Sequence, residues 1–488
     1  MGLPYDKYEA VIGLEVHAQL LTESKLFCGD SAAYGGAPNT HISPVTLAHP
    51  GTLPKMNRKA VEYAIRLGLA CGCGIERYNY FARKNYFYPD LPKGYQVSQH
   101  TTPICVGGHV TIRTAEGTRQ VQLNRIHMEE DAGKSLHDVD EAYTSIDLNR
   151  AGVPLLEIVT EPDLHSGEEA YAYLTELRKL VRYVEVCDGN MEEGSMRCDA
   201  NISIRLKGET ALGTKVEVKN LNSIRNVKKA IEIEIKRLVE LVESGGTVIQ
   251  ETRSFDAANG TTFSLRTKEE ANDYRYFPDP DLTPFHLTEE FIENIRSGMP
   301  ALPEEKVAQY MNGYMLPEYD ARQLADEKET AAYYDAVVSA FPEGAKFHKQ
   351  AANWLLGPVR SWLNEHGGNM SAFPVTPEKM VALIELVEAG KVNFSIAQQE
   401  ILPEMIISAD KMPMDIAVAK NLIQEGDTDT LKIWVEEVMA EMPDKVNEFR
   451  KGKKGLIGLF VGEVKKKSKG KADPKRTNDI LLEYLNNK

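Results

Sequence analysis

The chain has 488 residues, more than one hydrophobic core usually organises, so we expect two to four domains. Its composition is that of an ordinary globular protein, and its apolar runs are too short to cross a membrane. The formal charge of −15 argues against unspecific coating of nucleic acid, and no targeting sequence is recognisable, so we expect a cytoplasmic protein with no membrane partner.

The first predicted strand covers residues 10–21, AVIGLEVHAQLL. Successive side chains of a strand point to opposite faces, so Glu15 and His17 project together from one face. Ile12, Leu14 and Val16 form the apolar face opposite. A polar face of this kind is also found where a strand is simply exposed to solvent, so this strand alone does not indicate a site.

The cysteines are too few for their chain length to form a disulfide framework, and no CxxC pair indicates a zinc site. We expect them to be reduced and structural. They are Cys28, Cys71, Cys73, Cys105, Cys187 and Cys198.

Residues 82–96, ARKNYFYPDLPKGYQ, combine Arg83, Lys84 and Lys93 with four aromatic residues. Stacking surfaces beside positive charge suit contact with a nucleotide or with the end of a tRNA. An aromatic loop packed on the core would have the same composition.

Two segments have the pattern of β-hairpins, residues 110–123 and residues 202–218, each with a Gly-containing turn between alternating runs. Helices are predicted over residues 163–183 and 222–243, the second with Asn222 or Ser223 as its cap. Hairpins mixed with helices predict an α+β domain built on an antiparallel sheet.

Residues 124–135, NRIHMEEDAGKS, end in the Gly-Lys-Ser of a phosphate-binding loop. That loop needs a glycine five positions before Gly133, where this chain has Met128. Three adjacent acidic residues would also repel phosphate. We therefore interpret this stretch through its acidic residues rather than as a phosphate loop.

Further predicted strands also carry acidic residues. Glu157 falls in the apolar run 153–159, where a carboxylate is costly unless it is paired, protonated or bound to a metal. Asp199 lies on the polar face of residues 196–206, and Glu217 and Lys219 share a face within residues 214–220. Carboxylates with one histidine and nearby lysines suit Mg²⁺ and its phosphate ligands.

After about residue 285 the strand patterns give way to helical ones, including residues 348–367 and 376–390, and a further boundary is plausible near residues 403–414. Residues 450–476 contain eleven Lys and Arg against two acidic residues, which permits a directed contact with a polyanion or forms a solvated charge run. The sequence has no Rossmann glycine turn, no HExxH, no GxSxG and no amidase nucleophile segment.

Taken together, the chain resembles the GatB/GatE family, the B subunits of aspartyl/glutamyl-tRNA(Asn/Gln) amidotransferases. The resemblance rests on long motifs in the family's order along nearly the whole chain. They are YEAVIGLEVHAQLLTESKLFCG, RKNYFYPDLPKGYQVSQ, HMEEDAGKS, DLNRAGVPLLEIVTEPD, MEEGSMRCDANIS, KVEVKNLNS, DYRYFPDPDL and RKGKKGLIGLFVGEVKKKSKGKADP.

The resemblance implies three domains: a cradle-like catalytic domain over residues 1–293, a helical domain over 294–408, and a YqeY-like, tRNA-binding tail domain over 409–488. It also implies a heterotrimeric complex, in which an amidase-type A subunit supplies ammonia from glutamine and a small C subunit braces the pair. The substrate would be misacylated tRNA(Gln) or tRNA(Asn).

The implied activity is that of a glutamine-dependent carbon–nitrogen ligase in protein biosynthesis. ATP phosphorylates the side-chain carboxylate of the misattached glutamate or aspartate, and ammonia then displaces the phosphate to form the amide. Charge neutralisation and positioning would supply most of the rate. Two other interpretations stay open, a non-catalytic tRNA-binding scaffold and an ATP-dependent ligase acting on a free small acid.

The resemblance also implies the site residues, which overlap with the polar faces described above. Catalytic and Mg²⁺-binding positions are Glu15, His17, Glu130 and Glu157, with Glu129, Asp199 and Glu217 as further metal candidates. ATP or phosphate would contact Lys84, Thr214 and Lys219. The tRNA would contact Lys453, Lys454, Lys465, Lys466, Lys467 and Lys469.

One departure from the family concerns a zinc knuckle. Many members have four cysteines where this chain has Cys28, Asp30, Ser43 and Thr46. We therefore expect no structural zinc, with ordinary packing to hold the loop.

Overall fold

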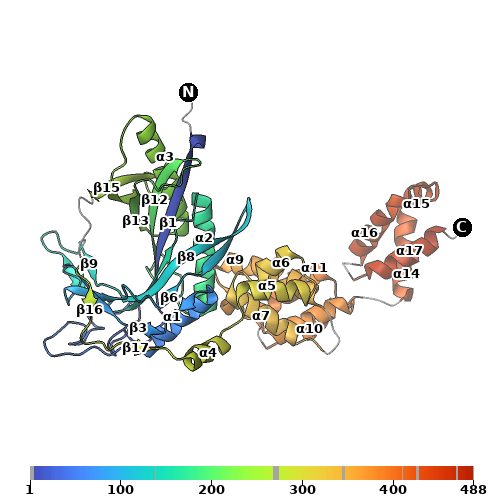
Figure 1. Ribbon diagram of the computed structural model, residues 1–488. Helices are drawn as coiled ribbons and strands as arrows, with labels where there is room; N and C mark the ends of the chain where they lie inside the picture. The colour runs from blue at the N-terminus through green and yellow to red at the C-terminus, as the bar shows by residue number, and fades with distance from the viewer. Residues whose placement is uncertain are drawn as a thin grey trace. The chain divides into compact units, whose positions relative to one another are not determined.

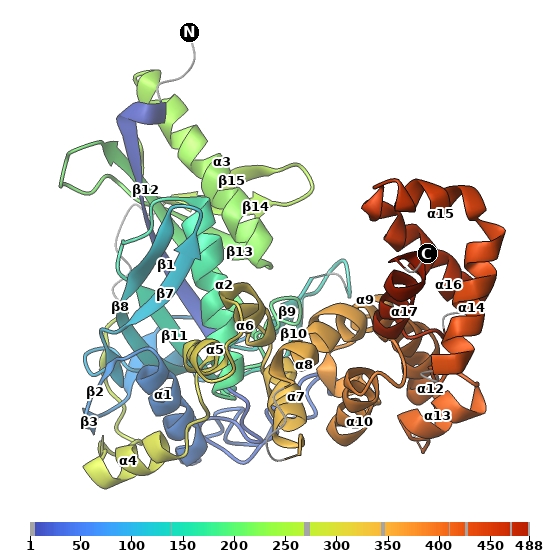
Figure 2. The same ribbon diagram turned by 90° about the vertical axis from the view of Figure 1, so that its right-hand side faces the viewer.

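The computed structural model describes residues 5–137, 139–267, 274–342, 347–408, 410–424, 428–468 and 471–486. The chain divides into two compact units, Met1–Pro303 and Glu304–Lys488, whose ribbons are drawn in Figures 1 and 2. None of the described helices is both long and apolar enough to cross a membrane.

Within the described residues, the first unit contains a thirteen-stranded sheet with the main order β15-β14-β13-β12-β1-β11-β8-β5-β4-β16. β2, β6 and β7 join it off this path. The strands are β1 (Tyr8–Gln19), β2 (Gly74–Ile75), β4 (Ala82–Asn85), β5 (Tyr95–Ser98), β6 (Cys105–Val106), β7 (His109–Thr114), β8 (Gly117–Glu130), β11 (Pro154–Thr160), β12 (Met196–Leu206), β13 (Val216–Leu221), β14 (Glu251–Asp256), β15 (Thr261–Thr267) and β16 (Phe277–Pro278). Two small sheets pair β9 (Lys134–Leu136) with β10 (Ser145–Asp147), and β3 (Tyr78–Asn79) with β17 (Phe285–His286).

The central strand β1 separates an apolar face from a polar one, as its sequence predicts. Ile12, Leu14 and Val16 are fully buried in the core of the first unit. That core lies between the sheet and the helices α1 (Arg58–Ala70), α2 (Gly167–Tyr183) and α3 (Ile224–Glu243), and Figures 1 and 2 show α2 and α3 beside the strands. α4 (Glu289–Ser297) completes the unit. Because the helices cover the apolar face, the opposite face is left to carry the polar side chains.

The predicted helices and hairpins of the first unit are confirmed. β7 pairs with β8, and β12 with β13, both antiparallel. The α3 helix begins after Ser223, whose hydroxyl accepts a hydrogen bond from the Asn226 amide, as expected of a cap. One pair differs from a purely antiparallel sheet, since β13 and β14 are parallel, and α3 is the crossover between them.

The Gly-Lys-Ser sequence does not open a helix. Lys134 and Ser135 belong to β9, and β9 pairs with β10 rather than leading into a helix N-terminus. The phosphate-loop interpretation therefore lacks the helix that such a loop requires.

The second unit is helical. It contains α5 (Pro303–Asn312), α6 (Glu318–Leu324), α7 (Lys328–Ser339), α8 (His348–Trp354), α9 (Arg360–His366), α10 (Pro377–Glu388), α11 (Phe394–Ile396), α12 (Leu402–Ile407), α13 (Pro413–Ala419), α14 (Thr428–Glu441), α15 (Pro443–Arg450), α16 (Ile457–Lys467) and α17 (Pro474–Asn486). The helix predicted over residues 348–367 is interrupted by a π-helical turn, Leu355–Val359, where Pro358 cannot donate a backbone hydrogen bond.

Two hydrophobic cores are formed by the described residues of this unit. The first extends to α13, with Ile416 and Ala417 buried and Ile423 packed against it, and the second begins at Leu431. These cores therefore separate after α13, later than the boundary predicted at residue 408. The division into domains at 293 and 408 stays a prediction.

The loop after β1 is held by hydrogen bonds at the four zinc-knuckle positions. The Cys28 thiol lies 3.3 Å from Asp30 Oδ2 and 3.4 Å from the Thr46 hydroxyl, and Thr46 also donates to Asp30. Burial opposes the charge of Asp30, but hydrogen bonds from Thr46, Ser43 and Cys28 outweigh it and lower the pKa of that carboxyl. One carboxylate thus receives the donors of the three other positions.

Candidate active site

The strand register aligns polar side chains from four strands on the face away from the helices. His17 on β1 is opposite Glu157 on β11, and Glu157 is opposite His127 on β8. On the other side of β1, His17 is opposite Arg197 on β12. Side chains directly opposite each other on one face lie within contact distance, so these residues form a row across the sheet.

His17, Glu129 and Glu157 converge into one cluster. His17 Nε2 lies 3.6 Å from Glu129 Oε1 and 3.4 Å from Glu157 Oε2. One donor atom from each of the three side chains lies within 4.8 Å of the other two. All three were metal candidates from the sequence, and the structure brings them together.

The charges in this cluster stabilise one another. Burial alone would lower the pKa of His17, but the carboxylates of Glu157 and Glu129 outweigh it and raise the pKa to about 9. Burial would likewise raise the pKa of Glu157, yet His127 and His17 hold it well below its usual range. The cluster therefore keeps an ionised carboxylate in a largely buried place.

His127 adjoins this cluster, although the sequence analysis did not single it out. Its Nε2 lies 3.6 Å from Glu129 Oε2 and 3.5 Å from Glu157 Oε2, so it touches both carboxylates. Arg125 Nε donates to His127 Nδ1 at 3.4 Å, which leaves Nε2 to carry the proton that faces the carboxylates. The alternation of Arg125, His127 and Glu129 along β8 was the signal that could have identified it.

Glu130 lies apart from the cluster that it was expected to join. It does not meet His17 and Glu157, because it leaves β8 in the direction opposite to Glu129. Its Oε2 lies 2.5 Å from Lys93 Nζ, and its Oε1 accepts a hydrogen bond from the Val97 amide at 2.9 Å. Among the described residues, the candidate ligand cluster therefore contains Glu129 in place of Glu130.

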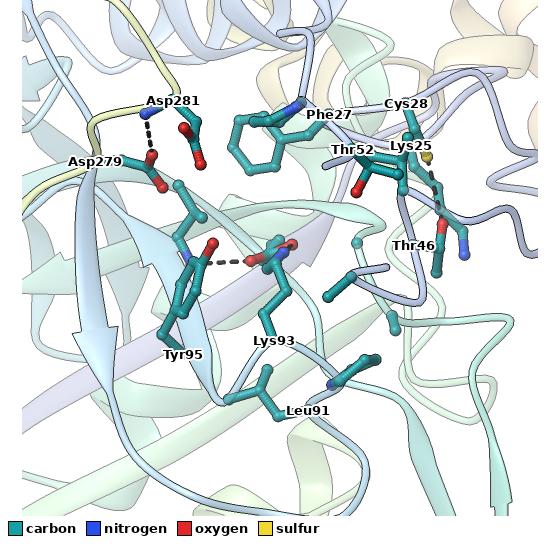
Figure 3. A pocket seen from close by; sticks show the side chains of 18 of the residues that line it. Lys25, Phe27, Cys28, Thr46, Thr52, Leu91, Lys93, Tyr95, Asp279 and Asp281 are labelled. Atoms are coloured by element: carbon teal, nitrogen blue, oxygen red, sulfur yellow. Dashed lines mark hydrogen bonds and ion pairs between the residues drawn. The ribbon is translucent and has the colours of Figure 1, made fainter. Parts of the chain in front are cut away.

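Glu130 and Lys93 line a separate cavity of about 120 Å³. Figure 3 shows Lys93 inside it, beside Phe27 and Tyr95. Lys93 Nζ lies 5.8 Å from the ring centre of Phe27 and 5.7 Å from that of Tyr95. This cavity holds the Lys93 ammonium between one carboxylate and two aromatic rings.

Glu15, Asp199 and Glu217 form a neighbouring group that the cluster does not include. Glu15 is opposite Asp199 in the sheet, and its Oε1 accepts a hydrogen bond from Asn201 at 2.9 Å. Lys219 Nζ lies 2.5 Å from Asp199 Oδ2 and 3.1 Å from Glu217 Oε1. Burial opposes the charge of Lys219, but Asp199 and Glu217 outweigh it and raise its pKa.

A cavity of about 600 Å³ is lined by His17, Glu129 and Glu157, and by Asp199 and Lys219 of the neighbouring group, whereas Glu15 and Glu217 do not line it. Lys84 lines it, and although burial opposes its charge, Glu129 and Glu157 help to raise the pKa of its ammonium. Thr214 is exposed before β13 and does not line this cavity. The lining residues are His17, Lys84, Tyr86, Gln96, Glu129, Asp131, Ala132, Leu155, Glu157, Met191, Gly194, Arg197, Cys198, Asp199, Lys219, Leu221 and Asn222.

The donor set fits a hard divalent cation. Two carboxylates and one imidazole suit Mg²⁺ or Mn²⁺, and such ions normally complete their coordination with water and substrate phosphates. The cavity above the cluster has room for such oxygens, and Lys84 and Lys219 supply positive charge around it.

The C-terminal lysines differ in the contacts that their ammonium groups make within the chain. Lys467 pairs with Glu437 at 3.0 Å and with Glu441 at 2.6 Å. Lys453 pairs with Glu448 at 3.1 Å, and Lys454 lies 4.3 Å from the ring centre of Phe449. Lys465 is exposed on α16, as is Lys466, and Lys469 lies outside the described residues.

The chain is similar to known proteins over nearly its whole length. A family model described as the GatB/GatE catalytic domain matches residues 10–293, and one described as the GatB domain matches residues 333–485. Three curated relatives are, by name, B subunits of aspartyl/glutamyl-tRNA(Asn/Gln) amidotransferases. The protein from Thermodesulfovibrio yellowstonii is 48% identical over 479 residues, which is 98% of this chain and 99% of the relative. That from Alkalilimnicola ehrlichii is 49% identical over 480 residues, again 98% and 99%. That from Geotalea uraniireducens is 49% identical over 483 residues, 98% of this chain and 100% of the relative.

Proposed function

Because the chain belongs to the GatB/GatE family, we propose that it amidates the side-chain carboxylate of a misacylated tRNA, forming Gln-tRNA(Gln) or Asn-tRNA(Asn). The protein is thus the ligase subunit of a multisubunit, ATP-dependent amidotransferase. The observation that carries the proposal is the cluster of His17, Glu129 and Glu157 at the base of a cavity flanked by Lys84 and Lys219.

The reaction has two balanced steps. The side-chain carboxylate of the attached glutamate or aspartate takes the γ-phosphoryl group of ATP, giving an acyl phosphate and ADP. Ammonia then attacks the acyl carbon, phosphate leaves, and the proton lost from nitrogen passes to solvent. Both steps gather negative charge in one place, so a site for them needs fixed positive charge more than a strong base.

The residues of the cavity meet that need. His17, Glu129 and Glu157 would hold Mg²⁺, which screens the phosphate charge when bound. Lys84 places its ammonium in the same cavity, and the nearby carboxylates favour the charged form of this side chain. His127 contacts both carboxylates and would keep them oriented toward the ion.

The group around Lys219 would serve the nucleotide. Lys219 is held by Asp199 and Glu217 at the edge of the cavity, where phosphate oxygens could take over its hydrogen bonds. Glu15 contributes carboxylate to this second group rather than to the cluster itself. The predicted contact of Thr214 with ATP or phosphate rests on the family resemblance alone.

The partners are those that the family resemblance implies. The sequence has no amidase nucleophile segment, which agrees with a separate source of ammonia. An amidase-type A subunit would release it from glutamine, with a small C subunit in the same heterotrimer. The exposed lysines of α16, Lys465 and Lys466, together with Lys453 and Lys454, would contact phosphates of the tRNA.

The test uses the assembled complex with each misacylated tRNA separately, with glutamine or ammonia as donor. Amide formation and tRNA-dependent ATP hydrolysis are measured for the wild type, for Glu157→Gln, and for Glu116→Gln in the exposed β7–β8 turn as control. We expect Glu157→Gln to lose both activities and the control to keep them. ATP hydrolysis with free glutamate and no tRNA would instead identify a small-acid ligase, and tRNA binding without hydrolysis would identify a scaffold.

A further inference from the structure

A group of aromatic side chains adjoins the cavity of about 600 Å³, which we call the reaction cavity. These side chains have no role in the chemistry described above. We call this group the aromatic array, and it comes from three segments that are distant in sequence. Ring centres lie 5.9 Å apart for Tyr86 and Tyr88, and 6.1 Å apart for Tyr86 and Tyr274. Tyr274 and Tyr276 are 6.1 Å apart, and Tyr276 stacks on His100 at 3.9 Å with the planes only 4° apart.

The aromatic array begins at the reaction cavity. Tyr86 and Lys84 both line that cavity. Lys84 Nζ lies 5.7 Å from the ring centre of Tyr86 and 5.1 Å from that of Tyr274, so one ammonium is shared by two rings of the array. The same ammonium interacts electrostatically with Glu129 and Glu157, so Lys84 connects the array to the cluster of candidate metal ligands.

The aromatic side chains of residues 86–88 differ in their exposure. Tyr86 is half-buried, Tyr88 is 53% exposed, and the neighbouring Phe87 is 91% exposed. By contrast, Phe81 on the same stretch of chain is 1% exposed and belongs to the core. Large aromatic side chains that gather at the surface beside a candidate site indicate a binding surface rather than packing in the hydrophobic core.

The proposed substrate places a nucleotide at this position. The amino acid is esterified to the terminal ribose of the tRNA, so a side-chain carboxylate held over His17 and Glu157 brings the terminal nucleotide to the mouth of the cavity. The 3′ end of a tRNA is single-stranded. Proteins bind such unpaired bases by stacking them on aromatic side chains.

We propose that the aromatic array and Phe87 stack the unpaired bases at the 3′ end of the aminoacyl-tRNA. This inference rests on the proposed function and adds the subsite that holds the substrate's terminal nucleotides. Tyr86 receives the base nearest the reacting carboxylate, and the exposed rings of Tyr88 and Phe87 receive bases farther out. A half-buried Tyr86 at the cavity with two exposed aromatic rings next to it in the chain suits a single strand with several bases, whereas ATP has only one base.

The experiment compares the assembled complex containing wild-type chain with one containing the double variant Phe87→Leu, Tyr88→Leu. These two side chains are exposed, so their replacement leaves the core intact. The matched control is Tyr78→Leu, because Tyr78 is also 53% exposed and also pairs with another ring, Tyr80, but is not part of the aromatic array. Tyr88→Phe tests whether the ring alone is sufficient.

We expect the double variant to raise the KM for Glu-tRNA(Gln) roughly 5- to 100-fold, the range that corresponds to losing one stacked base. Both kcat at saturating tRNA and the KM for ATP should stay within about twofold, because neither side chain touches the reacting atoms. Tyr78→Leu and Tyr88→Phe should behave like the wild type.

A second measurement does not depend on activity. A tRNA whose terminal adenine is replaced by 2-aminopurine loses fluorescence when that base stacks. The wild-type and Tyr78→Leu complexes should quench it, and the double variant should quench it less at equal occupancy.

Three outcomes would overturn the proposal. The first is an unchanged KM for tRNA together with unchanged quenching. The second is a raised KM for ATP alone, which would assign the rings to the nucleotide. The third is loss of the partner subunits on size-exclusion chromatography of the double variant, which would assign them to a subunit interface. A wild-type complex that amidates no tRNA would count against the proposed function, and the quenching measurement would still decide the stacking.

Discussion

Glu129 and Glu130 are neighbours in β8, yet their carboxylates serve different partners on different sides of the strand. Glu129 Oε1 lies 3.6 Å from His17 Nε2, whereas Glu130 Oε2 lies 2.5 Å from Lys93 Nζ. Both side chains are almost fully buried, at 4% and 2% exposed, so neither can turn to the other side without leaving its partner uncompensated.

This relationship predicts different responses to magnesium. Glu129→Gln should raise the Mg²⁺ concentration for half-maximal amidation on the order of tenfold or more, because a neutral amide is a weaker ligand. Glu130→Gln should leave that concentration unchanged, whatever it does to the maximal rate. A Mg²⁺ titration of both variant complexes measures this, and equal shifts in the two would contradict the ligand set.

His127 should act by positioning the two carboxylates. His127→Gln should raise the half-saturating Mg²⁺ concentration roughly 10- to 100-fold, since removing a hydrogen-bond partner of ligands typically costs that much affinity. The KM for tRNA should stay near the wild-type value. The control is His109→Gln on β7, where the ring contacts only the Gln120 side chain at 3.0 Å among the hydrogen bonds of the described residues. A loss of tRNA affinity without a Mg²⁺ effect would refute the positioning role.

Lys84 should stabilise charge in the transition state. Lys84→Met should lower kcat on the order of 100-fold, the usual cost of removing one fixed group that stabilises developing charge. Lys84→Arg should recover part of the rate because it restores the charge with a different shape. Lys59→Met on the surface of α1 is the control, as its ammonium forms an ion pair with the nearby Glu62 at 3.0 Å, within the same helix. Steady-state kinetics at saturating ATP and tRNA would show an unchanged kcat if the assignment is wrong.

The loop after β1 should be stable without metal. Metal analysis of the purified chain should find no stoichiometric zinc, since only Cys28 of the four positions offers a thiol. Asp30→Ala should lower the free energy of unfolding by about 1–2 kcal/mol, because it removes the common acceptor of Cys28 and Thr46. Urea unfolding measures this change, and Asp6→Ala, outside the loop, is the control.

The contribution of Asp30 should also depend on pH. Its pKa in the folded chain is held below the ordinary 3.8, so the stabilisation is present above that value. It should decline as pH falls below about 4 and through the folded pKa. The difference in unfolding free energy between the wild type and Asp30→Ala should therefore be constant at neutral pH and shrink in acid. A difference that grows on acidification would contradict the carboxylate's role.

The period-two alternation of the strands could be predicted from the sequence. It placed Glu15 and His17 on one face of β1, and Asp199 on the polar face of β12, and both placements are confirmed. The same alternation in residues 126–130 puts Glu129 with His127 and sets Glu130 with the apolar Met128. The preference for Glu130 as a ligand came from the family resemblance, and the local pattern argued against it.

What the sequence determined by itself is local: which residues form strands and helices, which face each side chain takes, and, through its long motifs, the family. What only the tertiary structure decided is the register between strands far apart in the chain. Register placed His17 opposite Glu157 and Glu157 opposite His127, and the tertiary fold placed Lys93 beside Glu130. The physical reason is that alternation follows from the backbone of one strand, whereas register depends on hydrogen bonds and packing between several.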